Sequence, residues 1–291
     1  MPHPLPERRR DVFVVVAHQD DWQLFMAPDV YARLRDPHAR VVFVVATAGE
    51  GRHGEHHWRA RLNGCVLAIT RALPSWNPYL AGESALPTAC SVSYARERVN
   101  ERDALVCTIN DDARAKPIRL YLLHAHDGGA QGVGLPPHHE SLTRLREEGR
   151  ALGVAWPPHA PHYESWDAFV ATLEAIVERE HDAGAPAELL AADPDPERNP
   201  GDHADHREIG RALQAILARR PFLEPTWYAM YANEHRPENL DPEAEADQRA
   251  AVFAYLGGYG ATASGLTAEW RIGTEREYAI FGKRQYRVKN P

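Results

Sequence analysis

Five short runs of apolar residues divide the chain. Two of them, VFVVVA and VVFVVAT, are continuous and rich in β-branched residues. This pattern is typical of strands that are buried on both faces of a mostly parallel sheet. The predicted strands are Val12–Ala17, Val41–Thr47, Ile118–His124, Ala187–Asp193 and Thr226–Ala232.

Between these runs, apolar residues recur at three- and four-residue spacing, which predicts amphipathic helices. The predicted helices are Trp58–Leu73, Ser165–Gly184, His206–Arg220 and Glu243–Gly258. Ser165 is an N-cap candidate, and Gly184 marks the end of its helix. Strands that alternate with helices predict an α/β domain with helices on both faces of the sheet.

The remaining segments predict one further strand and two long loops. Residues Glu277–Val288 alternate between apolar and polar positions, which predicts an added antiparallel strand. The stretches His124–Glu140 and Asp193–His206 are rich in glycine, proline and charge, and long loops on an α/β scaffold are usually functional or disordered. No internal repeat or interdomain linker is visible, so residues 1–291 are predicted to form a single domain.

Composition narrows the class of protein. Hydrophobic residues make up 44% and charged residues 25% of the chain, and the formal charge is −8. This balance argues against a nucleic-acid partner, which requires a basic face. No run approaches the roughly 20 apolar residues that span a bilayer, and the run after Arg8-Arg9-Arg10 is too short for a signal peptide. Cys65, Cys90 and Cys107 lack a CxxC pattern, which indicates reduced thiols and a cytoplasmic protein.

Titratable residues follow two of the predicted strands. The first strand ends in AHQDD, with His18, Asp20 and Asp21, and the fourth is followed by HADH, with His203, Asp205 and His206. In open parallel sheets, ligands bind outside the carboxyl ends of the strands. We therefore expect the two clusters to face one site.

These residue types suit a catalytic metal. Zinc typically takes three ligands from His, Asp or Glu and leaves one position for water. His18 and Asp21, with either His203 or His206, supply such a set, and Asp20 is then the candidate general base. A second histidine at the site would stabilise the oxyanion of an amide or ester substrate. HxxH alone is uninformative, because roughly one pair is expected by chance and the chain has three.

Structural alternatives exist for each motif. Asp20 and Asp21 could cap a helix that begins near Trp22, and Asp202 could cap the helix that follows His203. HGEHH at His53–His57 and PHHE at Pro137–Glu140 are more typical of exposed loops than of metal sites. The cysteines are expected to be small core residues.

AHQDD and HADH together resemble the signatures AHPDDE and HPDH of the LmbE-like, PIG-L-type de-N-acetylases. TAGEG at Thr47–Gly51 is similar to the glycine-rich segment of that family, and Arg59 falls where the family often has a substrate-contacting arginine. The likeness extends to about Arg220, so residues after about 221 are expected to form a divergent C-terminal extension of the same domain.

The resemblance implies a Rossmann-like three-layer sandwich and a zinc-dependent hydrolase that removes an acyl group, usually acetyl, from an amino sugar such as N-acetylglucosamine or its conjugate. It implies His18, Asp21 and His206 as metal ligands and Asp20 as the general base that deprotonates the zinc-activated water. His203 would assist at the transition state or the leaving group, and Asp205 would orient it. Substrate contacts would come from Arg59 and Asp127.

Two positions depart from the family signature. Gln19 replaces proline, which is expected to loosen the turn, and Trp22 replaces glutamate. The indole of Trp22 would offer an apolar wall for a sugar or acyl chain. Zinc is the expected cofactor, although a two-histidine, one-carboxylate set suits other divalent metals. The expected partners are a small-molecule substrate and, in a homo-oligomer, copies of the chain.

Two other functions remain open at this point. One is a zinc amidohydrolase that acts on an N-acyl amino acid or peptide-like amide, which would favour an apolar slot lined by Trp22 over hydroxyl-directed polar groups. The other is a non-catalytic Rossmann-like nucleotide-binding protein. It is disfavoured because AHQDD stands where a GxGxxG turn would be, and its charges repel a pyrophosphate.

Overall fold

The computed structural model describes residues 9–75, 90–157, 160, 162–262 and 275–288. These residues form one mixed sheet of eight strands in the order β3-β4-β5-β2-β1-β6-β7-β8. The parallel centre consists of β1 (Arg10–Val16), β2 (Ala39–Thr47), β5 (Ile118–Ala125), β6 (Ala187–Ala192) and β7 (Leu223–Ala229). The five predicted strands are therefore confirmed, with ends shifted by a few residues.

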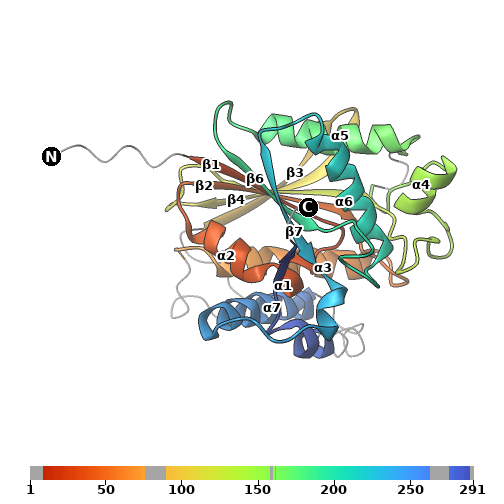
Figure 1. Ribbon diagram of the computed structural model, residues 1–291. Coiled ribbons are helices and arrows are strands. Elements are labelled where there is room, and N and C mark those ends of the chain that lie inside the picture. Colours follow the sequence, from red (N-terminus) through yellow and green to blue (C-terminus); the bar gives the residue numbers. More distant parts are fainter. Residues whose placement is uncertain (1–8, 76–89, 158–159, 161, 263–274, 289–291) are drawn as a thin grey trace.

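Helices cover both faces of the sheet (Figure 1). One face carries α1 (Asp21–Phe25), α2 (Ala27–Arg35) and α3 (Glu55–Arg71), and α7 (Pro242–Thr262) packs on their outer side. The other face carries α4 (Leu142–Glu148), α5 (Trp166–Glu180) and α6 (Ala204–Leu217). The predicted α/β three-layer fold is confirmed, as is the Ser165 cap, whose side chain accepts a hydrogen bond from the backbone N–H of Ala168.

The strand sequences explain why both faces are covered. In β1, Val12, Val14 and Val16 pack into the core under α1–α3. Phe13 and Val15 alternate with them and pack into the core under α5 and α6. Because successive side chains of a strand point to opposite faces, a continuous apolar run requires a hydrophobic layer on each side.

An antiparallel hairpin at one edge of the sheet was not predicted. It pairs β3 (Cys90–Val99) with β4 (Arg102–Asp111) around a two-residue turn at Asn100 and Glu101, whose φ angles are +43° and +64°. Positive φ at both turn positions is typical of hairpin turns that match the strand twist. Most side chains of β3 are exposed, so the strand lacks the apolar run that identified the central strands.

The tail of the chain only partly follows its prediction. Residues 275–281 are helical, and only β8 (Tyr286–Val288) forms the expected antiparallel strand, beside β7. The apolar residues of the first half, such as Phe281, pack in the core against Phe25 rather than along a sheet. The prediction of a strand from Glu277 was therefore wrong for its first half.

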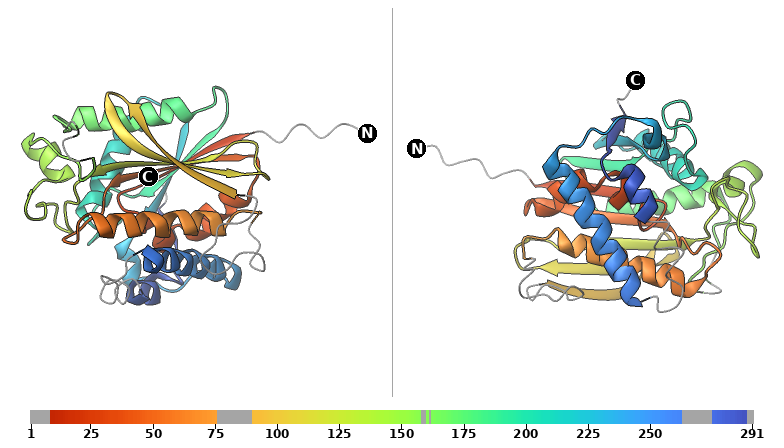
Figure 2. Two further views of the ribbon diagram at one scale, coloured as in Figure 1. Left: turned by 180° about the vertical axis from the view of Figure 1, so that it is seen from behind. Right: turned by 90° about the horizontal axis from the view of Figure 1, so that it is seen from below.

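The helices α3 and α7 lie side by side (Figure 2), and their close contact depends on two glycines. A Cβ atom on Gly258 would lie 2.7 Å from the carbonyl oxygen of Asn63, and one on Gly64 would lie 2.6 Å from that of Tyr255. The two backbones therefore approach more closely than side chains would allow. This contact places α7 against the helix that follows β2.

Within the described residues, no helix has the length and apolar character needed to cross a membrane. All three cysteines are free thiols, and Cys65 and Cys107 are buried core residues as expected, whereas Cys90 is half-buried.

Candidate metal centre and active site

The first part of the site is the turn after β1. The backbone N–H of His18 donates to Oδ2 of Asp21 at 2.8 Å, which closes the turn and orients the Asp21 carboxylate. Asp20 occupies the N-cap position of α1, but its side chain makes no capping bond, so capping does not explain this aspartate pair. Gln19 is buried and donates to the carbonyl of Ala48 at 2.7 Å. The turn is therefore tied to the end of β2 rather than loosened.

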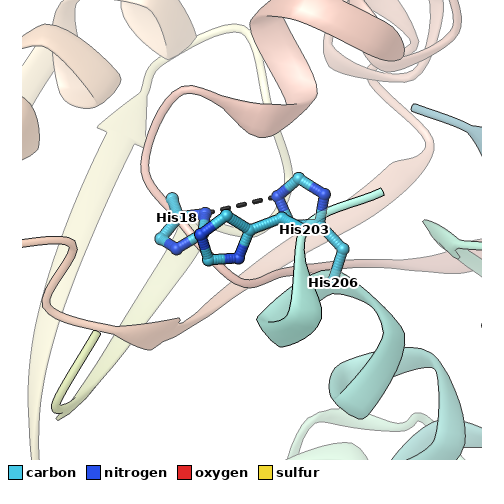
Figure 3. A group of neighbouring side chains, drawn as sticks. All are labelled: His18, His203 and His206. Atoms are coloured by element: carbon cyan, nitrogen blue, oxygen red, sulfur yellow. Dashed lines mark hydrogen bonds between the residues drawn. The ribbon is translucent and has the colours of Figure 1, made fainter. Parts of the chain in front are cut away.

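The second part is the loop that leads from β6 into α6. His203, not Asp202, is the N-cap of α6, and its Nδ1 accepts a hydrogen bond from the backbone N–H of Asp205 at 3.2 Å. His206 lies in the first turn of the helix and is buried. Figure 3 shows the imidazoles of His203 and His206 extending from the start of α6 toward His18.

Three lone-pair atoms from these two parts converge. His18 Nδ1 lies 3.3 Å from Asp21 Oδ1 and 3.3 Å from His206 Nε2, and the latter two atoms are 3.1 Å apart. Zinc with ligands at 2.0–2.1 Å in tetrahedral geometry separates its ligand atoms by about 3.3 Å. The donor set and its spacing therefore fit a divalent cation.

The far side of His206 is held by a buried carboxylate. His206 Nδ1 lies 2.8 Å from Oδ1 of Asp202, whose Oδ2 accepts from the side-chain amide of Asn199 at 2.7 Å. A carboxylate at Nδ1 keeps the proton there and leaves the Nε2 lone pair for a metal, the usual arrangement behind metal-binding histidines. No motif in the sequence marked this role of Asp202.

A second grouping surrounds the other nitrogen of His18. Its Nε2 is buried without a hydrogen bond, 3.6 Å from Asp205 Oδ2 and 4.0 Å from Asp127 Oδ1. Potential ligand atoms of His18, Asp127, His203 and Asp205 all lie within 4.8 Å of one another, as do those of His18, His203 and His206. The trio of His18, Asp21 and His206 has the shorter separations and the better fit to one ion.

The buried carboxylates around His18 and His206 favour a positive charge at the metal-ligand cluster. Burial opposes the imidazolium form of His206, but the carboxylates of Asp21 and Asp202 outweigh burial and raise its pKa to about 10. Burial likewise opposes charge on His18, yet Asp21 and Asp205 hold the pKa of His18 well above its usual value. His203 differs, because burial and the neighbouring His18 lower its pKa to about 4. It is therefore neutral at pH 7.

The candidate base Asp20 has a buried partner, Arg61, that no motif in the sequence indicated. Arg61 donates through Nη2 to Oδ1 of Asp20 and through Nη1 to the carbonyl of Gly49 at 3.0 Å. Arg59, which was predicted to contact substrate, instead lies on the exposed side of α3, where it pairs with Glu55 at 2.7 Å. The structure thus places Arg61, two residues later on the same helix, at the site.

A cavity of about 240 Å³ borders the cluster on the side of Asp127. Glu50, His126 and Asp127 supply polar groups to it, and Trp58, Leu135 and Pro136 supply apolar surface. Trp22 is 0% exposed and donates to Cys65 Sγ, so its indole lies in the core and cannot touch a ligand in this structure. The apolar lining of this cavity comes from Trp58, Leu135 and Pro136 instead. PHHE lies in the loop after β5 and is largely exposed, and HGEHH is exposed except for His57.

Residues after β7 also reach the site, although the likeness to the family signature fades before them. Tyr231 stacks on the imidazole of His206 with an interplanar angle of 5° and ring centroids 5.8 Å apart. Phe281, from the helical residues 275–281, packs against Tyr231. Burial and the charge of Asp20 raise the pKa of Glu277 on the same helix to about 7. No motif in the sequence marked these residues.

Residues 13–217 match the model of the PIG-L family, described as GlcNAc-PI de-N-acetylase, and the chain belongs to this family of deacetylases. The comparison with curated proteins gives no match.

Similar solved structures include the zinc-inhibited form of the teicoplanin deacetylase Orf2, at 10% identity and TM-score 0.42 over 85% of this chain and 84% of that one. They also include the A40926 pseudoaglycone deacetylase Dbv21, at 12% identity and TM-score 0.44 over 97% and 95% of the two chains.

Proposed function

We propose that the protein is a metal-dependent hydrolase that removes an N-acyl group, N-acetyl in the simplest case, from an amino sugar or sugar conjugate. The observation that carries this proposal is the convergence of His18 Nδ1, Asp21 Oδ1 and His206 Nε2 within 3.3 Å of one another. We infer that these residues hold the ion and that zinc is its identity, because two imidazoles and one carboxylate suit it. A divalent ion bound there would polarise the acyl carbonyl and lower the pKa of water.

Asp20 is the proposed general base. Its carboxylate follows His18 by two residues and precedes Asp21, and Arg61 holds one of its oxygens in place. Asp20 accepts the proton of the attacking water as the water oxygen bonds to the amide carbon. When the C–N bond breaks, that proton is available to the leaving nitrogen, and the products are the carboxylic acid and the free amine.

His203 is the proposed donor to the oxyanion. Its Nδ1 accepts a backbone hydrogen bond, so the proton of the neutral ring is on Nε2. A neutral imidazole can donate a hydrogen bond to a developing negative charge without losing its proton. The proton for the leaving amine is therefore assigned to Asp20 rather than to His203. Asp205 binds the backbone N–H of Gly128 through Oδ2, beside His18 and His203, and is assigned the orienting role.

The cavity beside Asp127 supports a hydroxyl-bearing substrate over an apolar one. Glu50 accepts from the backbone N–H of Asp127 and binds His126 Nδ1 at 2.8 Å, which fixes polar groups around the opening. Carboxylates and imidazoles are suited to bind sugar hydroxyls. The apolar slot that an N-acyl amino acid would favour is not built by Trp22, because that residue is buried.

Metal content and hydrolysis test this proposal together. The wild-type protein, purified without chelator, is expected to contain near-stoichiometric zinc and to release acetate from N-acetyl amino sugars. The Asp21→Ala, His206→Ala variant should lose both, whereas a His53→Ala, His56→Ala control removes another HxxH pair and should keep both. A folded wild-type protein that binds no metal, and gains no hydrolase activity with added zinc, would refute the proposal.

A further inference from the structure

A second cavity borders the cluster on the side of His203. Its volume is about 300 Å³, and its lining includes Ala130, Gln131, Gly201, His203, Arg207 and Tyr231. His203 and His18 have ring centroids 4.7 Å apart, and Asp127, which lines the first cavity, lies 4.0 Å from the same His18 ring. The two cavities therefore flank one catalytic cluster, so a substrate whose amide lies at the cluster can extend into both.

The permanently cationic group in the lining of this second cavity is Arg207. Asp202 also lines it, but both of its carboxylate oxygens are engaged, one by His206 and the other by Asn199. An anion that enters the cavity would therefore meet the guanidinium of Arg207.

This guanidinium lacks a partner within the described part of the chain. Arg207 is half-buried, and within the described residues its side chain makes no hydrogen bond or ion pair, whereas its backbone N–H donates to the carbonyl of His203. Arg211, one turn later on α6, does have a partner, because its guanidinium donates to the carboxylate of Glu208 at 2.7 Å. An arginine that is partly removed from water gains most from an oxyanion that can accept two parallel hydrogen bonds.

We propose that the cavity lined by His203, Arg207 and Tyr231 binds an anionic substituent of the substrate, a carboxylate or phosphate, and that Arg207 recognises it. This inference rests on the proposed function, since it places the substituent beside the amide that is hydrolysed. The opposite cavity is lined by three carboxylates and one arginine and would repel the same group; these residues are Glu50, Glu55, Asp127 and Arg52. The opposed charges therefore fix the direction in which the substrate lies across the cluster.

Binding and hydrolysis of three matched compounds test this inference. They are N-acetylglucosamine, N-acetylglucosamine 1-phosphate, whose anion is on the sugar, and N-succinylglucosamine, whose anion is on the acyl group. The zinc-loaded Asp20→Asn protein, which is expected not to hydrolyse them, allows dissociation constants to be measured by calorimetry. Hydrolysis is measured with proteins that keep the native Asp20. In both series, the protein with native Arg207 is compared with the variants Arg207→Gln and Arg207→Lys and with the control variant Arg211→Gln.

We expect the protein with Arg207 to bind at least one anionic compound about ten- to a hundredfold more tightly than the neutral one, the range for a charge-assisted hydrogen bond. Arg207→Gln should abolish that preference without weakening the binding of the neutral compound. Arg207→Lys should retain part of the preference, and Arg211→Gln should retain all of it. The compound that shows the preference identifies the side of the amide that enters the cavity.

Equal affinities for all three compounds, or an equal loss for all three in Arg207→Gln, would overturn the inference. The binding measurement decides this point even without turnover. Tight, Arg207-dependent binding without hydrolysis by the enzyme with intact Asp20 would uphold the anion site and refute the proposed reaction instead.

Discussion

Among single residues, Asp202 affects the site by holding the proposed metal ligand His206. Its carboxylate binds His206 Nδ1 at 2.8 Å and is itself held by Asn199. We expect Asp202→Ala to weaken zinc affinity about 10- to 100-fold, because the imidazole loses the group that orients it and keeps its proton on Nδ1. Competition with a chromogenic chelator measures this change. Asp195→Ala removes a carboxylate that pairs with Arg198 in the same loop and should leave the affinity unchanged.

Two arginines on α3 differ in burial and therefore in expected effect. Arg61 is buried against Asp20, whereas Arg59 forms an exposed pair with Glu55. Arg61→Leu would leave the carboxylate of Asp20 without its partner, a change that typically costs about 3–5 kcal/mol. Arg59→Leu removes a surface pair and should cost less than about 1 kcal/mol.

Denaturant unfolding of both variants gives their free energies of unfolding. Hydrolysis assays then separate the role of Arg61 from that of Arg59. The Arg61 variant should lose kcat, because the base is displaced. If Arg59→Leu instead raises KM selectively, the predicted substrate contact of Arg59 is upheld and a movement of its side chain toward the cavity follows. Equal stability of the two variants would contradict the assigned ion pair.

At the scale of elements, the contact of α3 with α7 depends on glycine at one position and not at its neighbour. A Cβ on Gly258 would meet backbone atoms of Asn63 and Gly64 at 2.7 and 2.9 Å, whereas one on Gly257 would meet only Leu67 Cδ2 at 3.9 Å. Gly258→Ala should therefore destabilise the protein by about 1–3 kcal/mol through overpacking. Gly257→Ala should stabilise it by up to about 1 kcal/mol, because alanine is the better helix former.

Thermal or urea unfolding of the two variants checks this pair. The same chemical change on adjacent residues of one helix removes helix propensity as an explanation of any difference. Stabilisation by both substitutions would show that the two helices are not in close contact in solution.

The elements that could be predicted from the sequence are those with a strong local signal. Continuous apolar strands such as Val12–Ala17 must be buried on both faces, so their place in the centre of the sheet follows from the sequence. The exposed strand β3 has no such run and is held by pairing with β4, a contact that local patterns do not reveal. The helical residues 275–281 were missed because Phe281 is fixed by Phe25 and Tyr231, which are remote in sequence.

The same distinction holds for the candidate site. AHQDD and HADH are compact motifs at strand ends, and they indicated which residues would meet. Three other residues contribute through tertiary contacts with those motifs, namely Arg61, Asp202 and Tyr231. The sequence around each of them does not distinguish it from an ordinary helix or loop residue. A local motif therefore identifies the residues proposed to carry the chemistry, whereas the residues that position them are found only in the folded structure.

For the whole molecule, a buried histidine links stability to pH. His124, at the end of β5, is 1% exposed and lies among Trp58 and Trp156, with ring centroids 4.6 and 5.5 Å away. Burial lowers its pKa to about 3 in the folded protein, against about 6.5 in an unfolded chain. Its contribution to the free energy of unfolding is therefore complete above pH 6.5 and falls as the pH drops toward 3, because only the unfolded state then binds the proton.

Between pH 7 and pH 5 this difference corresponds to about 2 kcal/mol for one histidine. The loss of stability over this range should therefore be smaller in His124→Asn than in the wild type by about that amount. Asparagine is the substitute because residue 124 has φ of +54°, a conformation that asparagine tolerates. Urea unfolding at both pH values measures the difference, and His138→Asn controls for the loss of an exposed histidine. An unchanged pH dependence in His124→Asn would mean that His124 takes up its proton while the protein remains folded.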